Sequence, residues 1–104
     1  MIRVSVLYPT QEGSKFDWDY YVNTHMPLVR KRFATDLVKD EIDRGLSSAE
    51  HGSTAPFQII VHLWFNSMKN VRNAMGKHGP ELTSDIPNYT DVIPIFQISE
   101  ITVE

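Results

Sequence analysis

The stretch Phe16-Asp17-Trp18-Asp19-Tyr20-Tyr21-Val22-Asn23-Thr24-His25-Met26-Pro27-Leu28 decides how this chain of 104 residues folds. Apolar and aromatic side chains recur in and beyond it at helical spacing. The stripe that they form consists of Trp18, Tyr21, Val22, His25, Met26, Val29 and Phe33. An imidazole therefore lies in the middle of a face that the folded chain buries. Because burying an imidazole without a partner is costly, we expect His25 to have a hydrogen-bond partner or to line a cavity.

Pro27 interrupts the same predicted helix. It lacks the backbone N–H that would bond the carbonyl of Asn23, and its ring crowds that carbonyl. We therefore expect the helix to kink or restart there, which leaves an unpaired carbonyl close to His25. A histidine beside a loosened helical turn on a buried face is compatible with a small pocket.

Length and composition predict a single domain over residues 1–104. The formal charge of -3 provides no basic surplus for nucleic acid or an anionic membrane. The chain has no cysteine, which excludes disulfides, thiolate nucleophiles and cysteine metal sites. No signal peptide pattern opens residues 1–15, and no apolar run has membrane-spanning length. We expect a cytoplasmic protein without a membrane or nucleic-acid partner.

Strands are predicted at the start, middle and end of the chain. Residues 2–8 alternate as a strand does, and residues 57–65 are apolar on both faces, which is typical of a central strand. A last strand is expected over residues 92–103, with Pro94 restricting its first part to a sheet edge or a bulge. Residues 35–48 fit a charged edge strand or a short helix, and we favour the edge strand.

A second helix is predicted to begin at Asn66 or Ser67 and to end near residues 76–79, with Pro80 opening a further turn. The order strand, helix, strand, strand, helix, strand predicts a ferredoxin-like α+β sheet with two helices on one face. Two helices cover only one side of that sheet, although the strand at residues 57–65 is apolar on both. We therefore expect a homodimer in which a second copy covers the other face.

Several segments resemble the EthD family, named from ethyl tert-butyl ether degradation. The resemblance is carried by Tyr8-Pro9, Phe16-Asp17, Tyr20-Tyr21, His25-Met26-Pro27-Leu28, Asp85-Ile86-Pro87-Asn88-Tyr89-Thr90-Asp91 and Gln97-Ile98-Ser99-Glu100-Ile101. Residues 38–56 have no counterpart in it. The resemblance implies a dimeric α+β barrel, formed by two four-stranded sheets face to face with the helices outside. It also implies a cavity between helices and sheet in each protomer, with His25 pointing into it.

The resemblance implies less about activity. Founding members of the family accompany oxidative ether degradation without a clear catalytic step, and the family label often carries the word reductase. Related barrels include cofactor-free decarboxylases, cyclases and monooxygenases.

His25 is the candidate catalytic residue. An unperturbed imidazole titrates at about 6.5, which suits general acid–base transfer near neutral pH. The alternative is a histidine whose hydrogen bond is satisfied by a core carbonyl. The candidate substrate-binding residues are Tyr21, Trp18, Tyr8, His62 and Trp64. Tyr21 ranks first because it lies one turn before His25, whereas the strand pattern leaves open whether His62 faces the helix-side cavity or the barrel interior.

Other polar residues have simpler interpretations. We expect His78 to suit the dipole at a helix end, His51 to be solvated in a loop, and Asp85 and Asp91 to act as caps beside a turn. No histidine pair has metal-ligand spacing, and no glycine-rich loop follows a strand. The sequence thus predicts neither a metal site nor a nucleotide cofactor.

These observations favour a protein that binds a small hydrophobic or aromatic molecule between the first helix and the sheet. If it is an enzyme, we expect cofactor-free decarboxylation, dehydration or cyclisation, with His25 as acid or base and Tyr21 orienting the substrate. One alternative is a non-catalytic accessory protein of an oxidative degradation pathway. Another is an oxidoreductase component whose redox cofactor belongs to a partner.

Overall fold

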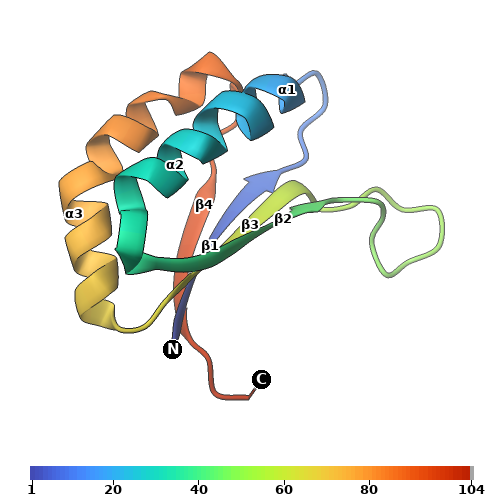
Figure 1. Cartoon of the computed structure of the whole chain (residues 1–104). Helices are drawn as coiled ribbons and strands as arrows, with labels where there is room; N and C mark the ends of the chain where they lie inside the picture. Colours follow the sequence, from blue (N-terminus) through green and yellow to red (C-terminus); the bar gives the residue numbers. More distant parts are fainter. Residues whose placement is uncertain (104) are drawn as a thin grey trace.

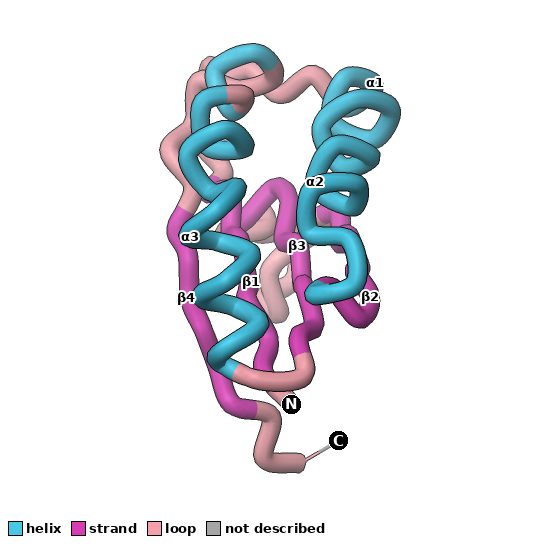
Figure 2. Tube along the Cα trace, turned by 60° about the vertical axis from the view of Figure 1, so that its left-hand side comes forward, coloured by secondary structure: helices cyan, strands magenta, loops and turns pink. Residues whose placement is uncertain are grey.

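A single antiparallel sheet with all helices on one face forms the fold in the computed structural model, which describes residues 1–103 (Figure 1). The strands are β1 (Ile2–Pro9), β2 (Leu37–Arg44), β3 (Phe57–Phe65) and β4 (Ile95–Glu100), in the order β2-β3-β1-β4. Figure 2 shows the two helical regions side by side on one face of the sheet. The predicted ferredoxin-like α+β fold is confirmed.

The first helical region is built from four short pieces. They are α1 (Trp18–Tyr20), the π-helical turn η1 (Tyr21–His25), α2 (Met26–Phe33) and the 3-10 turn η2 (Ala34–Asp36). Asp17 caps the start by accepting a hydrogen bond from the backbone N–H of Tyr20.

The expected interruption before Pro27 is the π-helical turn itself. The N–H of Met26 bonds the carbonyl of Tyr21, five residues back, and Pro27 follows at the start of α2. The π-helical turn that carries His25 therefore widens the helix next to Pro27, which lacks a backbone N–H donor.

The second long helix, α3 (Met68–Ser84), extends beyond the predicted end at residues 76–79. Ser67 caps it by accepting from the N–H of Asn70. The helix continues through Pro80 because the preceding residue, Gly79, has no Cβ to clash with the proline ring. The 3-10 turn η3 (Ile86–Asn88) follows.

The edge strands are partly as expected. Residues 37–44 form β2 at one edge of the sheet, which confirms the strand interpretation over the helix. β4 lies at the other edge but begins at Ile95, after Pro94, and ends at Glu100, so the expected strand over residues 92–103 was too long. Val92 is buried without belonging to a strand.

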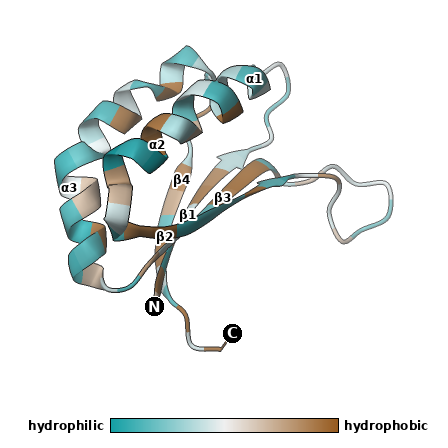
Figure 3. Cartoon of the chain, viewed as in Figure 1, coloured by the Kyte–Doolittle hydropathy of each residue, from teal (hydrophilic) through white to brown (hydrophobic). Residues whose placement is uncertain are grey.

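The two faces of the sheet differ in what covers them. The helix-facing side carries the core, and in Figure 3 hydrophobic residues are concentrated in the strands beneath the helices. No element among residues 1–103 covers the other side, which we call the open face, and Ile95 on it is 53% exposed. No helix in the described part of the chain has the length and apolar character to cross a membrane.

Candidate functional site

A cavity lies between the helices and the core side of the sheet. Its empty volume is about 500 Å³, counted with the open space at its mouth. Apolar side chains from β1, β3, α2 and α3 make up most of the wall. The polar side chains in that wall belong to Tyr8, Tyr21, His25 and Thr83. Such a site suits a small apolar molecule whose orientation is set by a few polar groups.

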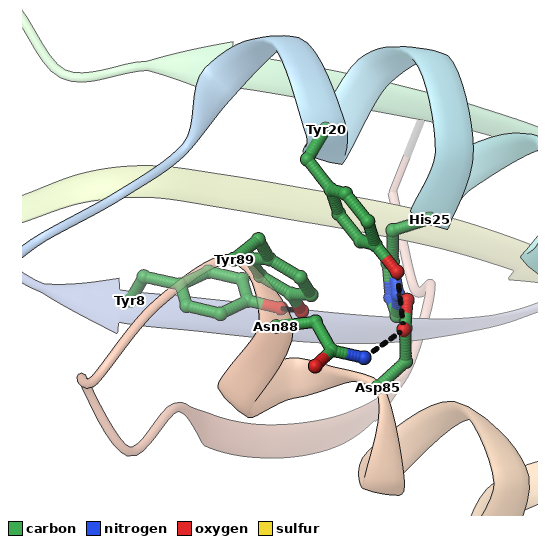
Figure 4. Close-up of polar contacts among 6 residues, drawn as sticks. All are labelled: Tyr8, Tyr20, His25, Asp85, Asn88 and Tyr89. Atoms are coloured by element: carbon green, nitrogen blue, oxygen red, sulfur yellow. Dashed lines mark hydrogen bonds and ion pairs between the residues drawn. The ribbon is translucent and has the colours of Figure 1, made fainter.

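His25 reaches the cavity from the π-helical turn and is only 6% exposed. Its Nδ1 lies 2.9 Å from Oδ2 of Asp85, the residue that ends α3 (Figure 4). Burial lowers the pKa of His25 below 6.5, and the contact with Asp85 opposes this shift without cancelling it. The imidazole is therefore neutral at pH 7. Because a carboxylate oxygen can only accept, Nδ1 carries the proton and Nε2 has the free lone pair.

Asp85 is held as an anion by three donors. Oδ1 accepts from the Tyr20 hydroxyl at 2.6 Å and from the Asn88 side-chain amide at 2.9 Å, while Oδ2 accepts from His25. Burial of Asp85 favours the neutral acid, but the three hydrogen bonds together outweigh it and lower the pKa of Asp85 below its ordinary value. A fixed negative charge thus lies behind the imidazole, and it can stabilise the imidazolium that forms when Nε2 takes a proton.

Tyrosine rings surround the imidazole. The ring of Tyr21 stacks on that of His25 at 5.5 Å, and the ring of Tyr89 lies 4.7 Å away on a tilted plane. The hydroxyls of Tyr89 and Tyr8 meet at 2.6 Å in the interior. Burial raises the pKa of all three tyrosines above 10, so their hydroxyls stay protonated.

The structure brings together only part of the predicted set of site residues. Tyr8 and Tyr21 line the cavity with His25, whereas Trp18, His62 and Trp64 lie outside it. Trp18 stacks on Tyr21 from outside. We do not include Trp18, His62 and Trp64 in the proposed site.

The alternation of β3 explains why His62 and Trp64 are excluded. Val61 and Leu63 face the helices, so His62 and Trp64 face the other way, onto the open face. There the Nδ1 of His62 lies 3.0 Å from the Ser5 hydroxyl, and the Lys39 ammonium lies 4.4 Å from the centre of the Trp64 ring. This answers the question left open by the strand pattern.

Sequence reasoning gave Asp85 only a capping role and did not single out Tyr20. Asp85 does end α3, but its side chain also accepts a hydrogen bond from His25. Its place in the segment that resembles the EthD family was the available signal. Among residues 1–103, no three side chains of the types that bind metals lie close enough together to hold an ion.

Comparison with known proteins shows which family the chain belongs to. The EthD domain model matches residues 12–93. The crystal structure of an EthD-like protein from Ralstonia eutropha JMP134 shares 39% sequence identity and a TM-score of 0.92, over 99% of this chain and 93% of that one. A comparison with curated proteins gives no match.

More distant structures share the fold. An ethyl tert-butyl ether degradation (EthD) family protein from Bacillus halodurans C-125 is 19% identical with a TM-score of 0.69, over 98% of this chain and 99% of that one. A dimeric protein of unknown function and ferredoxin-like fold from Bacteroides fragilis NCTC 9343 is 11% identical with a TM-score of 0.52, over 96% and 95%.

Proposed function

This chain belongs to the EthD domain family, and from this premise we propose that it binds a small hydrophobic or aromatic molecule in the helix–sheet cavity and transfers protons with His25. The observation that carries the proposal is the contact between Nδ1 of His25 and Asp85 at the wall of an apolar cavity.

The proposed chemistry follows from the tautomer. Because Nδ1–H donates to Asp85, the lone pair of Nε2 is free to take a proton from a bound molecule. The resulting imidazolium is stabilised by the carboxylate, and it returns the proton later in the cycle. Tyr21, stacked on the imidazole, orients the substrate. Decarboxylation of β-keto acids, dehydration and cyclisation can proceed through proton transfers of this type without a cofactor.

A non-catalytic role is the alternative. A histidine that is buried and hydrogen-bonded to a carboxylate is also an ordinary way of satisfying a buried polar group. In that case the protein is an accessory or carrier in an oxidative degradation pathway, or an oxidoreductase component that uses the redox cofactor of a partner. Binding without turnover distinguishes this alternative from an enzyme.

We also propose that the protein is a homodimer that covers its open face with a second copy. Support comes from the exposed apolar side chain of Ile95 on the open face and from the dimeric protein of Bacteroides fragilis that shares the fold. The single domain over residues 1–104, the cytoplasmic location and the absence of a cofactor stay predictions.

The test separates binding from turnover. Aromatic ketones and aromatic β-keto acids are incubated in D2O with the wild type and with His25→Gln. Affinity is measured by calorimetry, and deuterium uptake and loss of CO2 by mass spectrometry. The glutamine amide can still donate to Asp85, so we expect its affinity to stay within about threefold while turnover falls about 100-fold or more.

The matched control is His51→Gln, because His51 is exposed in a loop and should change neither quantity. Equal turnover in the wild type and His25→Gln contradicts the acid–base role. Binding without turnover in the wild type supports the accessory role, and no binding across the whole panel contradicts the proposed function.

A further inference from the structure

Two tyrosine hydroxyls meet beside the cavity, and the acid–base chemistry proposed above does not use them. Tyr8 comes from β1 and Tyr89 follows η3, and their oxygens lie 2.6 Å apart in the interior (Figure 4). Tyr8 lines the cavity, and the ring of Tyr89 lies between Tyr8 and His25 in contact distance of both rings.

A count of protons shows that one donor is left over. Two hydroxyls carry two protons, and the hydrogen bond between them uses one. Tyr89 does not line the cavity whereas Tyr8 does, so the arrangement in which Tyr89 donates to Tyr8 leaves the Tyr8 proton free on the cavity side.

The neighbouring hydroxyl of Tyr21 does not remove the surplus. It interacts with Tyr8 closely enough to influence the pKa of that residue. If Tyr8 gives its proton to Tyr21, the free donor moves to Tyr21, which also lines the cavity. In both of these arrangements one phenolic O–H faces the cavity, whereas donation from Tyr8 to Tyr89 would leave the spare proton on Tyr89. Burial raises the pKa of each of these tyrosines, so the group remains a donor at neutral pH.

We propose that the ligand of this cavity is an apolar carbonyl compound whose oxygen accepts a hydrogen bond from the Tyr8 hydroxyl, with Tyr89 as the positioning residue that donates to Tyr8. This inference rests on the proposed function and names its substrate class. A hydroxyl proton that faces the cavity selects a ligand that supplies an acceptor, because an apolar isostere leaves the donor unsatisfied.

The hydrogen bond from Tyr8 would also stabilise the intermediate of the proton transfer proposed for His25. When Nε2 of His25 takes a proton from the carbon next to the carbonyl, that C–H bond breaks and its electron pair moves to form the enolate. The negative charge then lies on the oxygen that Tyr8 bonds, and hydrogen bonds to charged oxygens are the stronger ones. Return of the proton to carbon restores the ketone, with no oxidant or reductant.

The probe is 2-acetylnaphthalene labelled with carbon-13 at the carbonyl, and its isostere is 2-isopropenylnaphthalene, in which a methylene group replaces the oxygen. We expect the wild type to bind the ketone about fivefold more tightly than the hydrocarbon. We also expect the carbonyl resonance to move downfield of its position in an apolar solvent. Tyr8→Phe should remove both effects and leave hydrocarbon binding unchanged, and Tyr89→Phe should weaken both.

Thr54→Val is the matched control, since it removes a hydroxyl at an exposed loop position outside the cavity wall and should leave the preference for the ketone intact. Equal affinity of the wild type for ketone and hydrocarbon, with the carbonyl resonance at its apolar-solvent position, overturns this inference and leaves the cavity proposal standing. A preference that survives Tyr8→Phe overturns the assignment to Tyr8. Binding of neither compound overturns the proposed function and this inference together.

Discussion

Nδ1 of His25 and Oδ2 of Asp85 lie 2.9 Å apart, although the two residues are 60 positions apart in the chain. His25 belongs to a π-helical turn and Asp85 to the end of α3. The contact therefore forms only when both helical regions have packed on the sheet. Both side chains are largely buried, at 7% and 13% exposure. The acid–base pair is therefore a product of tertiary structure.

The first prediction concerns the charge behind the imidazole. Asp85 raises the pKa of His25 against the larger opposite effect of burial. Asp85→Asn should therefore lower the pKa of His25 further, as measured by the pH dependence of its imidazole nitrogen resonances in NMR. Turnover should fall about tenfold or more, because the tautomer is no longer fixed by a carboxylate.

Asp91→Asn is the control for that change, because the side chain of Asp91 bonds the backbone N–H of Lys15 at the surface, away from His25. It should leave the imidazole resonances in place. An unchanged or higher pKa of His25 in Asp85→Asn contradicts the role given to the carboxylate.

The second prediction is that the free energy of unfolding decreases as the pH falls below 6.5. His25 in the folded chain has a lowered pKa, so between that value and 6.5 the unfolded chain binds more protons. Stability then rises with pH in this window, by at most about 1.4 kcal/mol per pH unit for one proton. The lowered pKa of Asp85 adds a loss of the same sign below 3.8.

Urea unfolding at a series of pH values measures this dependence. His25→Gln should flatten the curve just below pH 6.5, since glutamine does not titrate. His51→Gln should retain the slope of the wild type. An equally steep curve for His25→Gln assigns the slope to other groups.

Periodicity predicted the elements whose burial is regular. Residues 2–8 alternate and form β1, and residues 57–65, which are apolar on both faces, form the central strand β3. The prediction failed where two local signals compete. Pro80 usually stops a helix, but the absence of a side chain on Gly79 lets α3 continue. Pro94 delays the start of β4, because it cannot donate to the ladder.

Of the candidate site, only the residues of the first helix and Tyr8 on β1 were predictable from the sequence. His25 and Tyr21 share a helical stripe, so their joint burial follows from spacing alone. Asp85 could not be placed by spacing, since its contact depends on how α3 packs. His62 is a residue type that often occurs in functional sites, but strand alternation alone does not show which face of the sheet meets the helices. In the structure His62 lies on the open face.

The third prediction tests the entrance of the cavity. Thr83 lines the cavity and is itself exposed on α3, so it lies at the mouth. Thr83→Trp should reduce the affinity for 2-acetylnaphthalene about tenfold by filling that space, with little change in the melting temperature. Lys77→Trp places the same ring on an exposed position of α3 away from the cavity wall and should bind like the wild type. Unchanged affinity of Thr83→Trp contradicts entry at this point.

The last prediction tests the homodimer through the open face. Ile95 on β4 pairs with Leu7 of β1, and its side chain points to the open face with 53% exposure. A second copy covering this face would bury it, and a fully buried isoleucine contributes about 1.5–3 kcal/mol. Two-fold symmetry places the change in both subunits. Ile95→Lys should therefore weaken dimerisation about 100-fold or more, as measured by sedimentation equilibrium.

Leu46→Lys is the matched control, because Leu46 is 93% exposed in the loop after β2, outside the sheet. It introduces the same charge at an equally apolar residue and should sediment like the wild type. Dimers of equal strength in both variants would mean that the subunits associate through another surface. A wild type that stays monomeric at micromolar concentration would mean that the open face is stable in water, against the general tendency of large apolar surfaces to be covered.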